Sequence, residues 1–222
     1  MLYRKEMDLG CVILAGGKSS RMGQDKALLS YQGGSFLEGI CSTLDDFTDK
    51  YIARGPHEIC PEEIASDWKV IGDNYDEKGP LGGLEAALSS CKSKALFVTT
   101  CDMPLLQKSL VGVICRAYVE ITCKGDAEDF GREDVDAIYR EERDSLDALV
   151  VQTPDGRIHP LCGVYHTRVL PVIRQMLEED NCRLMRLLDQ LQVSYLQLDD
   201  AMAKQVTNVN TREDLQKLEE AT

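Results

Sequence analysis

The sequence predicts an α/β fold in which helices cover both faces of a mainly parallel sheet. Two observations support this. Short apolar runs such as Leu9–Leu14 and Ala95–Thr100 are typical of buried parallel strands. Between such runs lie segments with apolar residues at helical spacing, so strands and helices alternate along the chain.

Length and composition are those of one globular domain. The 222 residues are 43% hydrophobic, contain nine cysteines and only three histidines, and carry a formal net charge of −13. A protein that binds nucleic acid or membrane surfaces needs a basic face, so we expect neither partner. The odd number of cysteines and the lack of any C-x-x-C or His pair at ligand spacing argue against disulfide and zinc frameworks. With no signal peptide and no membrane span in the pattern, a cytoplasmic protein is expected.

The remaining elements are predicted from local patterns. Further strands are expected at Lys50–Arg54, Trp68–Ile71, Leu146–Gln152, Pro160–Tyr165 and Val193–Leu198. Capping boxes and apolar stripes predict helices after Ser35, after Pro80, around Leu106–Ala117, at Leu170–Glu179, at Leu184–Leu191 and after Thr211. The acidic segment 123–145 has little periodicity. We expect it to be a surface excursion from a single domain that spans residues 1–222.

A glycine-containing loop follows the first strand. Residues 14–26 read LAGGKSSRMGQDK, which lacks the first glycine of a P-loop and the spacing of a dinucleotide fingerprint. Gly16 and Gly17 let a ligand approach the backbone, and Arg21 and Lys26 offer charge to phosphates. The alternative is a solvated turn. The spacing of Arg21, Asp25 and Lys26 through a long loop favours a functional role in binding phosphates.

Carboxylates follow two other predicted strands. Asp73 precedes the glycine-rich segment 79–83, where it could accept hydrogen bonds from a nucleotide, although a plain Gly/Pro-rich connection fits equally well. Asp102 follows an apolar strand, where it could hold Mg²⁺ that bridges phosphates. A helix N-cap before Pro104 is the alternative role for Asp102.

A fourth polar group combines two distant segments, residues 155–160 and 208–211. His159 is a candidate for a substrate pocket, and Asn208 and Asn210 could either cap a helix or support a site. Ligands of open α/β sheets bind beyond the carboxyl ends of the strands, and all four polar groups follow such ends. We therefore expect the fold to bring them together.

Taken together, these motifs resemble those of the nucleotidyltransferases with a Rossmann-like fold of the nucleotide-diphospho-sugar transferase type. The likeness is greatest to the molybdenum cofactor guanylyltransferase family (MobA) and spans nearly the whole chain. The motifs that carry it are LAGGKSSRMGQDKALL at 14–29, IGDNYDEKGPLGGL at 71–84, TTCDMP at 99–104, PDGRIHPLCGVY at 154–165 and NVNTREDL at 208–215.

The resemblance implies transfer of GMP from GTP to the phosphate of molybdopterin or its molybdenum-bearing form, with release of pyrophosphate and with Mg²⁺ as cofactor. It implies catalytic roles for Arg21, Lys26 and Asp102, with Mg²⁺ on Asp102. The residues that it implies for nucleotide binding are Leu14, Ala15, Gly16, Gly17, Lys26, Asp73 and Asp102. It also leaves room for transient contacts with other cofactor-biosynthesis proteins or molybdoenzymes.

Related cytidylyltransferases tend to read LAAG, so Gly16 favours GTP over CTP. A cytidylyltransferase, a sugar-phosphate nucleotidyltransferase and a non-catalytic nucleotide or cofactor binder remain alternatives. The chain departs from the family pattern at Arg54, where an asparagine is more usual, and in the length of segment 123–145. At 180–183 only Arg183 is retained, and it is a further candidate for the substrate pocket.

Overall fold

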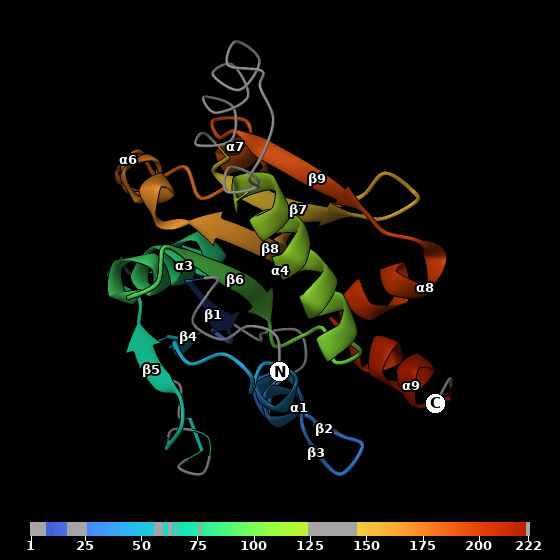
Figure 1. The fold of residues 1–222 in the computed structure, drawn as a ribbon. Coiled ribbons are helices and arrows are strands. Elements are labelled where there is room, and N and C mark those ends of the chain that lie inside the picture. The colour runs from blue at the N-terminus through green and yellow to red at the C-terminus, as the bar shows by residue number, and fades with distance from the viewer. Residues whose placement is uncertain are drawn as a thin grey trace.

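The computed structural model describes residues 8–16, 26–55, 60–61, 64, 66–75, 77–123 and 146–220. The described residues form a seven-stranded sheet with the order β5-β4-β1-β6-β8-β7-β9 (Figure 1). The strands are β1 (Leu9–Leu14), β4 (Lys50–Arg54), β5 (Lys69–Gly72), β6 (Ala95–Thr100), β7 (Ala148–Gln152), β8 (Ile158–His166) and β9 (Val193–Gln197). The predicted α/β class is confirmed.

Strand direction decides which loops meet. β1 pairs in parallel with β4 and β6, β4 pairs in parallel with β5, and β7 with β9. Only β8 among the strands of this described sheet runs antiparallel to its neighbours, so the sheet is mainly parallel as predicted. Figure 1 shows β6, β7 and β9 pointing toward α8 (Asp200–Ala203) and α9 (Arg212–Glu220). The carboxyl ends of these strands therefore share one edge of the sheet.

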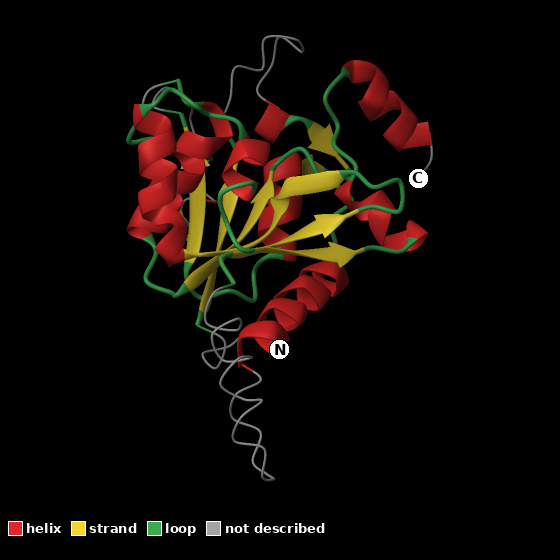
Figure 2. Cartoon of the chain, turned by 90° about the horizontal axis from the view of Figure 1, so that it is seen from above, coloured by secondary structure: helices red, strands yellow, loops and turns green. Residues whose placement is uncertain are grey.

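Helices cover both faces of the sheet, as Figure 2 shows. They include α1 (Phe36–Thr43), α3 (Gly79–Ser90), α4 (Lys108–Cys123), α6 (Leu170–Glu178) and α7 (Leu184–Leu188). In β1, Cys11 and Ile13 belong to the core beneath α1 and α4, whereas Val12 and Leu14 belong to the core beneath α3, α6 and α7. Successive side chains of a strand point to opposite faces, so the all-apolar run predicted a strand buried on both sides.

The two predicted capping boxes are confirmed. Ser35 Oγ accepts a hydrogen bond from the Glu38 amide at 3.2 Å, and the Glu38 carboxylate accepts one from the Ser35 amide. At α9, the Asp214 amide donates to Thr211 Oγ1 at 3.1 Å while the Asp214 carboxylate accepts from the Thr211 amide at 2.8 Å. Local side-chain chemistry thus fixed the start of both helices.

Other boundaries differ from the predictions. The helix expected at Leu184–Leu191 ends at Leu188, and the stripe around Leu106–Ala117 becomes a helix that begins at Lys108. The structure adds a small hairpin of β2 (Ser30–Tyr31) and β3 (Gly34–Ser35), the helix α8, and 3₁₀ turns at Lys26–Leu28, Thr167–Val169 and Lys204–Val206. These pieces are too short for periodicity to reveal.

A bulge in β8 interrupts its pairing with β7 near the carboxyl end of β7. Val150 of β7 pairs with Gly163, but the next residue, Val151, pairs with His159, so residues 160–162 have no partner in β7. A Cβ on Gly163 would lie only 2.2 Å from the Leu149 carbonyl oxygen. Glycine is therefore required for the two strands to approach each other at the bulge.

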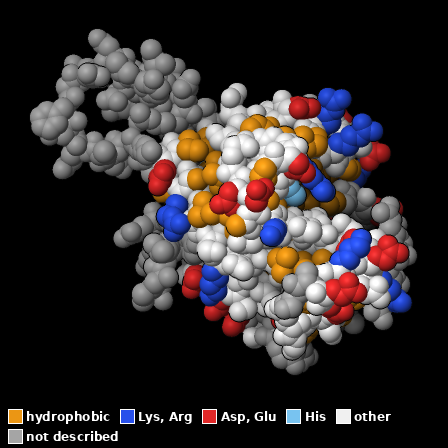
Figure 3. Space-filling view, turned by 90° about the vertical axis from the view of Figure 1, so that its right-hand side faces the viewer, with side chains coloured by type: hydrophobic (Ala, Val, Ile, Leu, Met, Phe, Trp, Pro, Cys, Tyr) orange, Lys and Arg blue, Asp and Glu red, His pale blue; other side chains and the backbone are white. Residues whose placement is uncertain are grey.

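The face drawn in Figure 3 carries acidic and basic side chains side by side, with a histidine in a hollow among them. Over the described residues, no helix is both long and apolar enough to span a bilayer. The acidic excursion that we predict at 123–145 lies outside the described residues from position 124 onward.

Candidate functional site

The loop after β1 begins between two neighbouring strands. The Ala15 amide donates to the Ala53 carbonyl at 2.9 Å, and the Leu14 carbonyl accepts from the Cys101 amide at 3.3 Å. Gly16 is exposed directly beyond them. Leu14, Ala15 and Gly16 thus lie where parallel strands end, as predicted. Gly17 and Arg21 lie outside the described residues.

Asp73 lies against the first turn of α3. A Cβ on Gly83 would lie 3.5 Å from Asp73 Oδ1 and 3.3 Å from Leu14 Cδ2, and one on Gly82 would lie 3.6 Å from Asp73 Oδ2. The two glycines therefore let the carboxylate, the helix start and the end of β1 approach one another. Asp73 and the loop after β1 form one side of the site.

Asp102 follows β6, the strand next to β1. Its carboxylate accepts a hydrogen bond from Thr100 Oγ1, and its backbone carbonyl accepts from the Val209 amide at 2.8 Å. The alternative role as an N-cap is wrong, because α4 begins only at Lys108. Asp102 is partly buried and joins the end of β6 to the segment before α9.

Lys26 and Asn210 meet across the site. Lys26 Nζ donates to Asn210 Oδ1 at 2.8 Å, although 184 positions separate the two residues. The Asn210 side chain does not cap α9, because Thr211 does so. Of the two roles left open for Asn210, capping by its side chain is wrong, and support of a site stays a prediction.

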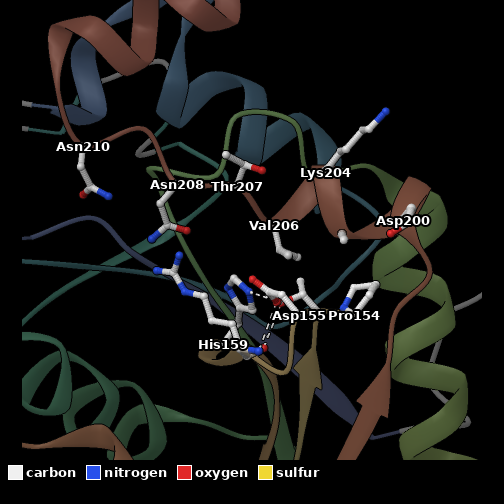
Figure 4. A pocket seen from close by; sticks show the side chains of 12 residues that line it. Pro154, Asp155, His159, Asp200, Lys204, Val206, Thr207, Asn208 and Asn210 are labelled. Atoms are coloured by element: carbon white, nitrogen blue, oxygen red, sulfur yellow. Dashed lines mark hydrogen bonds between the residues drawn. The ribbon is translucent and has the colours of Figure 1, made fainter.

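A pocket of about 390 Å³ opens beside this contact (Figure 4). Its wall combines the turn after β7 with the segment that runs from α8 to α9. The lining residues are Thr153, Pro154, Asp155, Arg157, His159, Asp200, Ala203, Lys204, Val206, Thr207, Asn208 and Asn210. The predicted meeting of His159, Asn208 and Asn210 in one place is confirmed.

The comparison of sequences identifies the family. Residues 11–195 match the profile of the MobA-like NTP transferase domain. The chain belongs to this family. It is a nucleotidyltransferase, and the resemblance seen in its motifs is confirmed.

Relatives of this transferase cover nearly its whole length. A probable molybdenum cofactor guanylyltransferase of Flavobacterium johnsoniae is 27% identical over 93% of this chain and 94% of that protein. One from a Geobacillus species is 28% identical over 90% and 92% of the two chains. Among solved structures, molybdopterin-guanine dinucleotide biosynthesis protein A of Archaeoglobus fulgidus superposes with a TM-score of 0.71 at 19% identity, over 96% and 97% of the chains. This structural similarity supports the assignment of the α/β fold.

His159 forms part of the floor of the pocket in this transferase. It is 9% exposed, and its Nε2 lies 3.5 Å from Thr153 Oγ1, which also donates to the Asp155 carboxylate. Burial, and then the charge of Arg157, lower the pKa of His159, which favours a neutral imidazole at pH 7. Sequence reasoning missed Thr153, although the turn signal Thr-Pro-Asp-Gly marks its position.

Asn208 presents an unsatisfied acceptor to the pocket. Its Oδ1 is buried and receives no hydrogen bond from the described residues. An amide oxygen buried in this way costs free energy unless a ligand or water donates to it. The side chain is therefore suited to bind an N–H or O–H donor of a ligand.

Two residues that the sequence analysis singled out, Arg183 and Arg54, do not line the pocket. Arg183 is exposed at the N-terminus of α7 and is not among the lining residues. Arg54, where the chain departs from the family pattern, is 1% exposed at the end of β4. Sequence reasoning also missed Asp200 and Lys204 of the pocket rim, because a four-residue helix gives no periodic signal.

The donor set suits a magnesium ion held partly by substrate. The described residues contain no group of three or more His, Cys, Asp or Glu that could hold a metal by themselves. Mg²⁺ commonly takes one or two protein carboxylates and completes its shell with phosphates and water. Thr100 uses one oxygen of Asp102, which leaves the other for a cation. Asp102 therefore fits the role that the family implies.

Proposed function

We propose that this transferase, as one domain over residues 1–222, moves GMP from GTP to the phosphate of molybdopterin or its molybdenum-bearing form. The observation that carries the proposal is the position of Asp102. Its strand lies between β1, whose loop adjoins Asp73, and β8, which leads to the pocket of His159. This position supports a role for Asp102 between the proposed nucleotide side and the proposed acceptor side.

The chemistry needs no protein nucleophile. An oxygen of the acceptor phosphate attacks the α-phosphorus of GTP, the bond from that phosphorus to the bridging oxygen of the β-phosphate breaks, and pyrophosphate leaves with the electron pair. A phosphate nucleophile is already ionised at neutral pH, so no strong base is required. In-line positioning and neutralisation of charge then account for most of the rate.

Each proposed residue has one task. Lys26, held by Asn210, is placed to neutralise phosphate charge, and Arg21 is assigned the same task from its motif alone. Leu14, Ala15, Gly16 and Gly17 would contact the nucleotide largely through the backbone, and Asp73 would help to hold it. Mg²⁺ on Asp102 would supply positive charge at the phosphates. The Asn208 amide oxygen offers an acceptor to the N–H groups of a pterin.

A reaction with defined substrates tests the proposal. Purified protein is incubated with Mg²⁺, molybdopterin and each of GTP, CTP, ATP and UTP, and pyrophosphate and dinucleotide are measured. We expect product with GTP and about a hundredfold less after Asp102→Asn, with Asp189→Asn on the surface as the control. Product with CTP and none with GTP would identify a cytidylyltransferase instead.

An experiment in cells distinguishes the proposed enzyme from a non-catalytic nucleotide or cofactor binder. If Asp102→Ala supports maturation of molybdoenzymes as well as the unmodified protein does, catalysis by this site is excluded. We expect maturation to be lost while the variant stays folded, because Asp102 lies on a loop and is partly exposed.

A further inference from the structure

Glu85 is a buried carboxylate in the middle of α3. Its side chain is 1% exposed, yet Oε2 accepts from Asn74 Nδ2 at 2.8 Å, and Oε1 accepts from Arg174 Nε and Ser89 Oγ at 2.8 Å each. Arg174 Nη2 also donates to Ser89 Oγ at 2.9 Å. Buried carboxylates are tolerated when they are paired and hydrogen-bonded in this way. Burial would raise the pKa of Glu85, but the three donors together lower it, so the group stays charged.

The Glu85 network joins two parts of the fold. Asn74 follows Asp73 directly in the connection between β5 and α3, whereas Arg174 belongs to α6. A second link runs the same way, because Lys78 Nζ contacts Asp180 Oδ1 at 2.6 Å just beyond the end of α6. The connection is therefore tied to α6 near both of its ends. Asn74 reaches Arg174 of α6 through Glu85, and Lys78 pairs with Asp180 just beyond α6.

This connection needs such restraint. Glu77 has a φ of 57°, which is costly for a residue other than glycine, and Gly79 follows with a φ of 60°. Conformations of this kind persist when surrounding contacts determine them. A buried carboxylate and two sets of polar contacts therefore restrain the short connection that begins with Asp73.

We infer that Glu85 is a positioning residue for nucleotide binding and that it acts through its hydrogen bonds with Asn74 and Arg174. By holding Asn74, it fixes the adjacent Asp73 carboxylate against Gly82 and Gly83, next to the end of β1. Loss of the network frees Asp73 from that place and weakens the nucleotide complex. The inference rests on the proposed function, because it takes Asp73 as a nucleotide contact.

Steady-state kinetics with GTP tests the inference through Asn74→Ala and Glu85→Gln. Asn74→Ala takes one donor from the buried Glu85 carboxylate, so it should lower the melting temperature modestly. KM for GTP should rise about fivefold while kcat stays within about twofold. Glu85→Gln should raise KM at least as much, because a neutral amide pairs poorly with Arg174. Asp73→Asn provides the benchmark for loss of the contact itself.

Asp49→Asn is the matched control. Asp49 is likewise a buried carboxylate with several donors, but it precedes β4 and so lies at the amino end of the strands, opposite the site. We expect it to lose stability without a change in KM. An equal rise of KM in Asp49→Asn and Glu85→Gln would overturn the inference, since general loss of stability would then explain both.

Amide hydrogen exchange gives a readout that needs no activity. In both Asn74→Ala and Glu85→Gln, the amides of residues 73–75, 77 and 78 should exchange faster by about tenfold than in the unmodified protein. Unchanged protection, or an unchanged KM in folded variants, overturns the inference and leaves the proposed function intact. Faster exchange in a protein that never turns over GTP would refute the proposed function instead.

Discussion

At the residue scale, the role that we propose for Lys26 depends on how its side chain is held. Its ammonium group is held at 2.8 Å by Asn210, whose backbone amide donates in turn to the Asp214 carboxylate at 2.9 Å. The capping box of α9 thus orients the residue that contacts Lys26. In the proposed function, this restraint reduces the reorganisation that Lys26 would need to bind a triphosphate.

Lys26→Ala should lower kcat/KM for GTP by about a hundredfold, because a positive charge at the transferring phosphate is lost. Asn210→Ala should have a smaller effect, since the lysine remains. Exposed Lys217 on α9 supplies the control Lys217→Ala, with unchanged kinetics. Circular dichroism should show all three folded, and loss of fold in Lys26→Ala would mean that this lysine is structural.

Position 163 requires glycine because there is no room for a side chain there. Gly163→Ala would place Cβ 2.2 Å from the Leu149 carbonyl and 2.8 Å from Val150 Cα, both of them backbone atoms. Because backbone cannot move aside cheaply, we expect a loss of about 3 kcal/mol or more in the free energy of unfolding. Urea denaturation measures it. Gly39→Ala, where nothing lies within 4 Å of the new Cβ, is the control and should not destabilise.

At the scale of elements, helix starts depend on a few polar contacts. The capping box of α1 combines Ser35 and Glu38, and the hydrogen bonds from the Ser35 amide and then its hydroxyl lower the pKa of Glu38. The adjacent hairpin of β2 and β3 ends at Ser35. One serine therefore joins the end of the hairpin to the first turn of the helix.

Ser35→Ala should cost about 1 kcal/mol in the free energy of unfolding, because the Glu38 amide loses its acceptor. Ser35→Thr keeps the oxygen and should stay within about 0.5 kcal/mol of the unmodified protein. Chemical denaturation of the three proteins measures both values. A neutral Ser35→Ala would show that packing alone defines the start of α1.

At the scale of the whole molecule, charges are arranged so that acid destabilises the fold. Within the described part of the chain, the carboxylates whose pKa values are lowered are Glu38, Asp49, Glu85, Asp155, Asp180 and Asp214. For Asp49, burial would raise the pKa, but hydrogen bonds from Lys69, the Lys92 amide and Tyr51 together lower it. These donors lie in β5, after α3 and in β4.

A group with a lowered folded pKa stabilises the fold above its unfolded pKa, and this contribution is lost as pH falls through the folded value. We therefore expect the free energy of unfolding to fall steeply below about pH 4. Asp49→Asn should be less stable at pH 7 and show a shallower decline in acid. Thermal unfolding between pH 7 and pH 3 measures this, and identical pH profiles would contradict it.

Most strands, the starts of α1 and α9 and the order of the polar clusters could be predicted from the amino-acid sequence. Apolar runs, helical stripes and capping boxes depend on residues that are close in the sequence, so they can be recognised without knowledge of the tertiary structure. The sequence also identified Lys26, Asp73, Asp102, His159 and Asn210 as candidates, because several polar groups follow the carboxyl ends of predicted strands, where ligands of open α/β sheets bind.

The way in which these residues combine could not be predicted, because it depends on how the sheet is assembled. The reversed direction of β8 and its bulge bring the turn at Thr153 beside the segment before α9, which forms the pocket. The contacts of Lys26 with Asn210 and of Glu85 with Arg174 join residues 184 and 89 positions apart. No local pattern encodes such pairs, because their distance depends on strand order and direction, which are fixed only when the sheet assembles.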